Sequence, residues 1–322
     1  MSDERTQADG PKIRLGISTC LLGEKVRYDG GHKQNSYIID TLGKYFEFRS
    51  FCPEMAIGLG VPRQTIRLIN EDDRIQAVGV KNEAMRVTDE LIAIADEQKS
   101  WHQNIFGYIV KKGSPSCGME RVKIYSNGMP FQNGAGLYTQ TMMENFPDLP
   151  VEEEGRLGDA VLRENFVHRV FIYRRWHETC EAGLSWQALM AFHGRHKLIL
   201  FSHDQTLARK LGKDLAESHD QPLAAFADSY ISRLMSILKI PAKRSNHVNV
   251  LEHIRGYLKQ DLDKSDKQEL TDSIENYRRG LLPLIVPITL LRHHFRRNPN
   301  EYIERSYYLQ PHPDELMLLN SL

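Results

Sequence analysis

Short apolar runs that end in turn residues recur through the first half of the chain and strongly constrain its fold. Four such runs, rich in aliphatic and aromatic residues as strands are, cover Ile13 to Ser18, Glu47 to Phe51, Ile75 to Val80 and Ile105 to Val110. Between the last two, residues 82–101 place apolar side chains on one stripe, which predicts an amphipathic helix. The alternation predicts an α/β domain with a mostly parallel open sheet, whose ligand crevice lies beyond the carboxyl ends of the strands.

The second half of the chain shows one helical pattern after another, with few strand-like alternations. Proline, glycine and a run of acids between Phe146 and Asp159 are typical of an exposed connection. We therefore predict an α/β domain over residues 11–150 and an all-α C-terminal domain over residues 156–322, with residues 1–10 as a polar, frayed tail. The predicted helices cover Ala160 to Glu178, Ser185 to His193, Asp204 to Glu217, Pro222 to Leu238, Asn246 to Lys259, Lys264 to Leu281 and Pro287 to Arg296.

The composition is that of an ordinary globular chain with room for two domains. Of its 322 residues, 41% are hydrophobic and 26% are charged. No signal-peptide pattern opens the chain, and the longest apolar stretch, Leu281 to Leu291, is interrupted by prolines and too short to span a bilayer. We therefore expect a cytoplasmic protein without a membrane partner. In that reducing compartment, the four cysteines favour metal ligands or nucleophiles over disulfides.

The two halves of the chain carry opposite formal charge, although the net charge is zero. Residues 1–155 hold 18 Lys and Arg against 22 Asp and Glu, whereas residues 156–322 hold 24 against 20. Eleven of the thirteen histidines also lie in the second half. This asymmetry suggests an anionic partner for the second half.

Three of the four cysteines share one local pattern, because each follows an apolar run and opens a turn that contains glycine or proline. They are Cys20 in "GISTCLLG", Cys52 in "RSFCPEM" and Cys117 in "SPSCGM". Cys180 lies in the helical half without this context and is interpreted as a bystander thiol. If the sheet is parallel, the three thiols converge on one crevice. Taken alone, each could also be a small core residue.

The spacing of these cysteines argues against a structural zinc site, which normally needs four ligands, commonly in close pairs such as C-x-x-C. A cubane iron–sulfur cluster held by three cysteines would leave one iron without a protein ligand. Such an iron is a soft Lewis acid that prefers sulfur to oxygen or nitrogen.

Three strings around the cysteines resemble the thiouracil desulfidase (TudS) family. They are "SxCLLGxxxRYDGGHK" from Ser18 to Lys33, "CPE" from Cys52 to Glu54, and "SPSCG" from Ser114 to Gly118. The helical half is similar, more loosely, to the YbgA-type domain found fused to that family.

The resemblance implies a [4Fe-4S] cluster whose free iron takes the sulfur of a thiolated uracil. For the fused form, it implies 4-thiouridine in tRNA as the substrate and no nucleotide cofactor. Carried over by motif, the cluster ligands are Cys20, Cys52 and Cys117, and the catalytic residues are Glu54 and Ser114.

These roles are chemically reasonable, because desulfuration at C4 needs an activated water and a place for the departing sulfur. Glu54 could act as general base on that water, or be a solvated turn carboxylate. The Ser114 hydroxyl could bond the base or the water, or only cap its turn. For Ser116 and Ser18 we favour turn stabilisation, and the lysine pair 111–112 is expected to be solvated.

Other candidate substrate contacts come from the first cysteine motif and from basic clusters in the helical half. Arg27 and Tyr28 could contact phosphate and stack on a uracil ring, although turn chemistry also explains the "DGG" that follows. Basic clusters beside aromatic residues predict tRNA contacts, although single clusters on helices are usually solvated. The candidates there are Arg174, Arg175, Arg195, Lys197, Lys243, Arg244, Arg296 and Arg297.

Two other functions stay open at this point. The first is a desulfidase of free thiouracil or thiouridine monophosphate, which would need only the α/β domain. The second is a noncatalytic iron–sulfur protein that binds RNA. A metal site at His196, His293 and His294 is not favoured, since adjacent histidines on a helix point in different directions.

Overall fold

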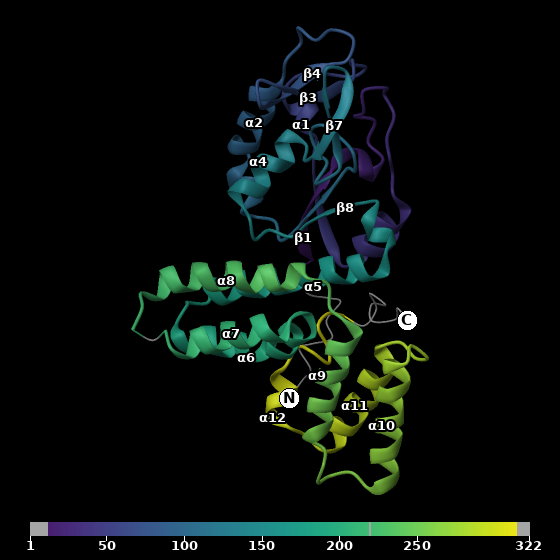
Figure 1. The fold of residues 1–322 in the computed structure, drawn as a ribbon, viewed down its shortest axis with the longest axis vertical. Helices are drawn as coiled ribbons and strands as arrows, with labels where there is room; N and C mark the ends of the chain where they lie inside the picture. The colour runs from purple at the N-terminus through teal and green to yellow at the C-terminus, as the bar shows by residue number, and fades with distance from the viewer. Residues whose placement is uncertain (1–11, 219, 314–322) are drawn as a thin grey trace. The chain divides into compact units, whose positions relative to one another are not determined.

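The computed structural model describes residues 12–218 and 220–313, which are drawn in colour in Figure 1. The chain divides into two compact units, one that ends at Asp159 and one that begins at Ala160. The tail predicted over residues 1–10 lies outside the described residues. In the described part of the chain, no helix has both the length and the apolar character needed to cross a membrane.

Four parallel strands form the sheet that positions the candidate site. Leu15, Ile17 and Ile109 on its two central strands have no exposed surface, as expected for a parallel sheet covered on both faces. Each neighbouring pair is parallel, so the prediction of an α/β domain with a parallel sheet is confirmed. In spatial order the strands are β2 (Phe46–Phe51), β1 (Ile13–Ser18), β5 (Tyr108–Val110) and β8 (Val151–Glu153).

A second sheet of four strands contains the run that we expected to join the parallel strands. The run Ile75 to Val80 forms most of a strand that pairs antiparallel with its predecessor, so its predicted place in a parallel sheet is wrong. The cause is the two-residue turn Asp72–Asp73, whose φ angles of 50° and 60° reverse the chain as a tight hairpin does. In spatial order the strands are β4 (Arg74–Gly79), β3 (Ile66–Glu71), β6 (Val122–Ser126) and β7 (Met129–Gly134).

The helices of this unit are shorter than the sequence pattern predicted. In the range 82–101, α2 spans only Thr88–Glu97 and α3 spans Lys99–His102, because Arg86 forms a β-bridge with Val78 instead of extending the helix. The Thr88 hydroxyl accepts a hydrogen bond of 2.8 Å from the Ala77 N–H and thereby ties α2 to the second sheet. The remaining helices are α1 (Pro53–Ala56) and α4 (Leu137–Asn145), and α4 packs beside α2 (Figure 1).

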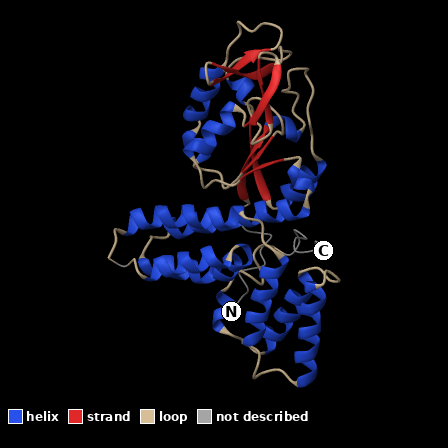
Figure 2. Ribbon diagram, in the orientation of Figure 1, coloured by secondary structure: helices blue, strands red, loops and turns tan. Residues whose placement is uncertain are grey.

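From Ala160 on, the described residues form helices and no strand, which confirms the predicted all-α half (Figure 2). Side-chain caps begin several of these helices, for example Ser185 at α6 and Asp204 at α7. The helix α6 continues to His203, ten residues past its predicted end. The helices are α5 (Ala160–Glu181), α6 (Trp186–His203), α7 (Gln205–Ala216), α8 (Leu223–Lys239), α9 (Arg244–Gly256), α10 (Lys264–Arg278), α11 (Ile285–Arg297) and α12 (Glu301–Arg305).

Buried histidines belong to the core of the helical unit. The His193 ring lies 3.0 Å from the Tyr230 hydroxyl, and the His247 ring lies 2.8 Å from the Tyr308 hydroxyl. Burial lowers the pKa of His193 to about 4 and the pKa of His247 to about 3. These side chains are therefore neutral near pH 7 and serve as hydrogen-bonding core residues.

Candidate active site at the carboxyl ends of the parallel strands

The three cysteines singled out in the sequence follow three adjacent strands of the parallel sheet. Cys20 lies in the short helix Thr19–Leu22 directly after β1, Cys52 follows β2, and Cys117 lies in the turn beyond β5. All three line one cavity of about 300 Å³. Parallel strands deliver their carboxyl ends to one edge of the sheet, so segments 32 and 65 positions apart meet there.

The cysteine thiols sit in a dry environment and form no disulfide. Cys20 and Cys117 are buried, and all four cysteines of the chain are free. Burial raises the pKa of the Cys20 thiol, and Arg27 opposes this shift. Burial also raises the pKa of Cys52, and it raises the pKa of Cys117 far above its usual range. The thiolate forms therefore need a compensating positive charge, such as a metal provides.

All three cysteine side chains contribute to the lining of this cavity. Within residues 12–218 and 220–313, no three His, Cys, Asp or Glu side chains are placed to hold a single metal ion.

Aromatic side chains lie directly behind the cavity. Phe51, which lines the cavity, stacks on Tyr138 with ring centroids 5.3 Å apart. The Tyr138 hydroxyl lies 2.8 Å from the His102 ring. Burial lowers the pKa of His102 to about 4, so this ring is neutral. The cluster provides an apolar support for the cysteine-bearing turns.

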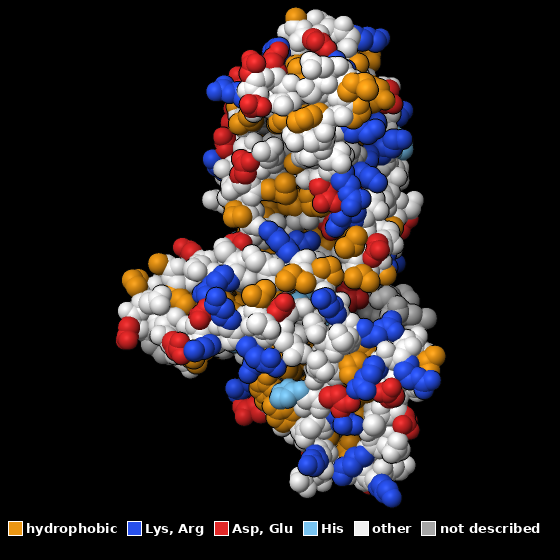
Figure 3. Space-filling model, in the orientation of Figure 1, with side chains coloured by type: hydrophobic (Ala, Val, Ile, Leu, Met, Phe, Trp, Pro, Cys, Tyr) orange, Lys and Arg blue, Asp and Glu red, His pale blue; other side chains and the backbone are white. Residues whose placement is uncertain are grey.

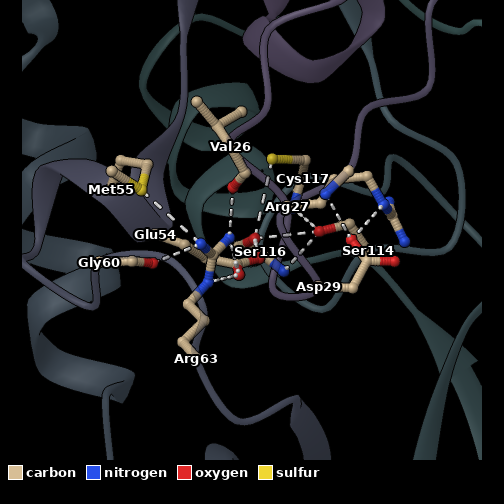
Figure 4. A network of polar contacts seen from close by, with 11 residues as sticks. Val26, Arg27, Asp29, Glu54, Met55, Gly60, Arg63, Ser114, Ser116 and Cys117 are labelled. Carbon is tan, nitrogen blue, oxygen red and sulfur yellow. Dashed lines mark hydrogen bonds and ion pairs between the residues drawn. The ribbon is translucent and has the colours of Figure 1, made fainter.

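Glu54 is held in this cavity by groups from two other segments, as Figure 4 shows. Arg63 Nε donates to Glu54 Oε2 at 2.8 Å, and Arg63 Nη2 forms an ion pair with the same oxygen at 2.7 Å. The Ser116 hydroxyl donates to Glu54 Oε1 at 2.5 Å. The Glu54 side chain is only 16% exposed. It is therefore a fixed carboxylate in the cavity wall, and the solvated turn carboxylate that we considered is excluded.

The two serines before Cys117 differ in how the structure uses them. Ser114 lines the cavity, and its Oγ accepts a hydrogen bond of 3.1 Å from the Cys117 N–H, so it does stabilise the turn. Its Oγ also lies 3.0 Å from Ser116 Oγ. Ser116 is fully buried, and the prediction that it only stabilises the turn is wrong, because it bonds Glu54 directly. No local pattern could reveal this contact across 62 positions.

Arg27, Tyr28 and several lysines complete the cavity wall. Arg27 lies over the Tyr28 ring at 5.3 Å, and its Nε is 3.8 Å from Asp29 Oδ1. That buried Nε has no hydrogen-bond partner among the described residues. Lys111 and Lys112 also line the cavity, but Lys111 is not the solvated residue that we predicted, since it pairs with the largely buried Glu154.

The predicted RNA contacts of the helical unit differ in exposure. Arg174 pairs with Glu178 at 2.7 Å, and Arg175 donates to the Pro311 carbonyl at 2.6 Å and stacks over Tyr307. Arg244, also partly buried, lies over the Tyr277 ring. Figure 3 shows cations mixed with acidic side chains on one face of the helical unit. The exposed candidates are Arg195, Lys197, Lys243, Arg296 and Arg297.

Arg63 is a site residue that no sequence pattern singled out. It lies outside the three cysteine strings, in a turn rich in glycine and proline, and its neighbours carry no recognisable pattern. Its side chain is only 5% exposed and lines the cavity. Only the fold shows that it faces Glu54.

Comparison with known proteins assigns a family to each half of the chain. A family described as 2-thiouracil desulfurase matches residues 15–154, and a family of unknown function, DUF1722, matches residues 197–313. The chain is 33% identical over 154 residues to the uncharacterized protein YbgA of Escherichia coli. This alignment covers 48% of this chain and 91% of YbgA. A solved structure, that of the [4Fe-4S]-dependent thiouracil desulfidase TudS, matches with 32% sequence identity and a TM-score of 0.37. This match covers 47% of this chain and 97% of the TudS chain.

Proposed function

Because the chain belongs to the YbgA family and carries a 2-thiouracil desulfurase domain over residues 15–154, we propose that it removes sulfur from 4-thiouridine in tRNA. The α/β unit would hold the base and the chemistry, and the helical unit would bind the RNA. The four free cysteines suit the reducing cytosol in which tRNA is found.

One observation carries this proposal: three cysteine thiols, a fixed carboxylate and an arginine without a full set of partners line a single cavity. A cavity of about 300 Å³ is at the lower end of the range found for small-molecule sites, and a single nucleobase is a small ligand. The cavity therefore suits one base extruded from an RNA chain, as enzymes that modify bases require.

The donor set fits a [4Fe-4S] cluster. Cys20, Cys52 and Cys117 would hold it, and the structure provides no fourth cysteine at this cavity, since Cys180 lies in the helical unit. When bound, the cluster would supply an open iron position that polarises the carbon–sulfur bond and accepts the departing sulfide. Buried thiols against an aromatic wall suit such a group, because the cluster charge compensates the thiolates and solvent is kept away.

The hydrogen bonds of Glu54 identify the atom that would take a proton from water. Arg63 contacts Oε2 through a hydrogen bond and an ion pair, whereas among the described residues Oε1 accepts one hydrogen bond, from the Ser116 hydroxyl, and keeps a lone pair for water. Water that donates to Oε1 would bond through its oxygen to C4 of the base, the carbon–sulfur bond would break, and sulfide would leave with the protons of that water. No net electron transfer is needed. The Ser114 hydroxyl, which lines the same cavity, would bond the base or the water.

The role of the helical unit rests on its cations. Arg195, Lys197 and Lys243 are exposed, as are Arg296 and Arg297 at the end of α11. Exposed Lys and Arg bind the phosphate backbone regardless of sequence and make the affinity depend on salt. A free nucleobase would need none of them.

The test is a sulfide-release assay after anaerobic reconstitution. We expect four irons per chain and sulfide release from 4-thiouridine in tRNA. Glu54→Gln should lower this rate at least about 100-fold, the lower range for a general base, while the visible absorption of the cluster is kept. Glu83→Gln is the control, because Glu83 is exposed and away from the cavity. Full iron content without sulfide release from any thiolated uracil would contradict the proposal.

Free thiouracil or thiouridine monophosphate is the second candidate substrate. It is favoured by one observation, since every residue that lines the cavity belongs to the unit that ends at Asp159. Turnover of the nucleotide at a higher kcat/KM than thiolated tRNA would select this alternative. Iron and RNA binding without turnover would instead indicate a noncatalytic protein.

A further inference from the structure

Every nitrogen of the Arg63 guanidinium is engaged by the protein. Besides the hydrogen bond of Nε to Glu54, Nη1 donates to the Gly60 carbonyl at 2.8 Å and lies 3.6 Å from Met55 Sδ, and Nη2 donates to the Val26 carbonyl at 2.9 Å (Figure 4). These contacts use four of the five N–H donors of an arginine side chain, and Nη2 also forms the ion pair with Glu54. Arg63 is therefore committed mainly to protein groups, although it lines the cavity.

The contacts of Arg63 join the segments that carry the proposed substrate and water contacts. Through Val26 it holds the loop that presents Arg27, and its own N–H donates to the Tyr28 carbonyl at 2.9 Å. Through Gly60 and Glu54 it holds the turn that follows Cys52. One side chain thus sets the distance between the loop and the carboxylate.

The carboxylate is fixed because it is held on both oxygens. Arg63 contacts Oε2 through the Nε hydrogen bond and the Nη2 ion pair, and the Ser116 hydroxyl donates to Oε1. The planar guanidinium places two nitrogens against one carboxylate oxygen, which a lysine ammonium cannot do. With Arg63 on Oε2 and Ser116 on Oε1, the remaining lone pair of Oε1 has one defined direction.

We propose that Arg63 is a positioning residue for desulfuration: it aims Glu54 Oε1 at the water and sets the Arg27–Tyr28 loop against it. This inference rests on the proposed function. Arg63 acts through Glu54, and its side-chain hydrogen bonds go to Glu54, Met55, Gly60 and Val26 rather than to a cluster cysteine. The loss of its contacts to Glu54 should therefore slow the chemical step while the protein still folds and holds iron.

The test compares Arg63→Lys with Arg67→Lys in the reconstituted full chain. Arg67 is a matched control, because it also pairs with a glutamate, Glu83, but lies outside the cavity. We expect Arg63→Lys to lower kcat about 100-fold, the size of effect that a misplacement of about 1 Å produces, with a smaller change in KM. Its iron content, visible absorption and melting temperature should match those of Arg67→Lys.

A double-mutant cycle distinguishes positioning from a general structural role. If Arg63 acts through Glu54, adding Arg63→Lys to Glu54→Asp should cost little beyond Glu54→Asp alone. Fully additive losses, or a loss confined to KM, would overturn the inference. If Arg63→Lys loses iron, Ser116→Ala tests the same arrangement from the other oxygen, and an unchanged kcat there would overturn it.

The failure of this inference differs from the failure of the proposed function. If the wild-type protein with full iron content releases no sulfide from thiolated tRNA or nucleotide, the function itself is wrong. If the wild type is active and Arg63→Lys is as fast as Arg67→Lys, only the role of Arg63 is wrong.

Discussion

At the scale of single residues, each important side chain in the cavity depends on a partner far away in the sequence. Glu54 meets Ser116 across 62 positions, and the Lys111 N–H donates to the Ser18 hydroxyl across 93. Both contacts join segments at or just beyond the carboxyl ends of strands that share one sheet. The chemistry of one residue is therefore set by the pairing of strands.

Each of the single replacements of Cys20, Cys52 and Cys117 with serine should remove most of the bound iron, because a serine hydroxyl is a poor ligand for soft iron. Cys180→Ser should keep full iron content, since Cys180 is exposed and lies in the helical unit. The iron content per chain and the visible absorption of each variant, measured after anaerobic reconstitution, check the predicted loss and the predicted retention of iron. Equal iron in all four variants would show that the cavity is not the cluster site.

The residues of the site were predictable only where the pattern was local. Each cysteine lies in a distinctive string, and those strings placed Glu54 and Ser114 beside them. Ser116 and Arg63 could not be assigned, because their importance comes from which oxygen of Glu54 each one bonds. The sequence shows which side chains can donate or accept hydrogen bonds, but only the folded structure shows which of them are partners.

At the scale of elements, the turn that carries Cys117 packs against the start of α4 without room for a side chain. A Cβ at Gly136, the residue before α4, would lie 2.5 Å from the Ser116 carbonyl carbon and 2.8 Å from the Cys117 nitrogen. The Thr139 hydroxyl, inside α4, donates to the Cys117 carbonyl at 2.7 Å. The helix and the turn are thus held backbone to backbone.

Gly136→Ala should therefore displace the cysteine turn and lower both iron content and sulfide release. The backbone of Gly136, with φ −69° and ψ 142°, suits alanine, so the effect would come from the steric clash alone. Gly158→Ala is the control, because nothing lies within 4 Å of its added Cβ. The prediction is wrong if the two variants hold equal amounts of iron.

The elements themselves were predictable to different degrees. The strands of the parallel sheet and the helices of the second half follow from apolar periodicity. The antiparallel pairing of β4 could not be predicted, because apolar periodicity does not say which strand pairs with which. The Asp72–Asp73 turn also lacks the glycine that usually indicates such a hairpin.

At the scale of the whole molecule, the two units should respond differently to acid. The helical core holds His193, His203 and His247, whose pKa values burial lowers to about 4, about 4 and about 3. When the pH falls below 6.5, the ordinary histidine pKa, these histidines bind protons in the unfolded chain but stay neutral in the folded core. The stability that these neutral histidines contribute is therefore fully present above about pH 6.5 and is lost as the pH drops toward about 4.

His247→Gln should weaken this acid dependence, because it removes one of the proton sites that only the unfolded chain fills. His253→Gln is the control, since His253 is exposed on the same helix. Melting temperatures from pH 8 to pH 5, with hydrogen exchange to locate the unfolding unit, measure the slope. Equal slopes for both variants would contradict the histidine explanation.

Binding of tRNA should weaken steeply with salt, since we propose that it rests on phosphate contacts. Replacing Arg296 and Arg297 with alanine should make the plot of log affinity against log salt shallower by about 2, one for each lost contact. Lys213→Ala is the control, because Lys213 pairs with Glu217 and is not among the proposed contacts. An unchanged slope in the double variant would remove α11 from the proposed interface.

The origin of the three thiols on separate, neighbouring strands also bears on when the proposed cluster could be inserted. The chain must be synthesised past Cys117, and β5 must pair with β1 beside β2, before all three sulfurs lie at one cavity. If these cysteines hold the cluster as we propose, its insertion would follow the folding of the parallel sheet. Protein made without iron would then fold first and accept the cluster afterwards.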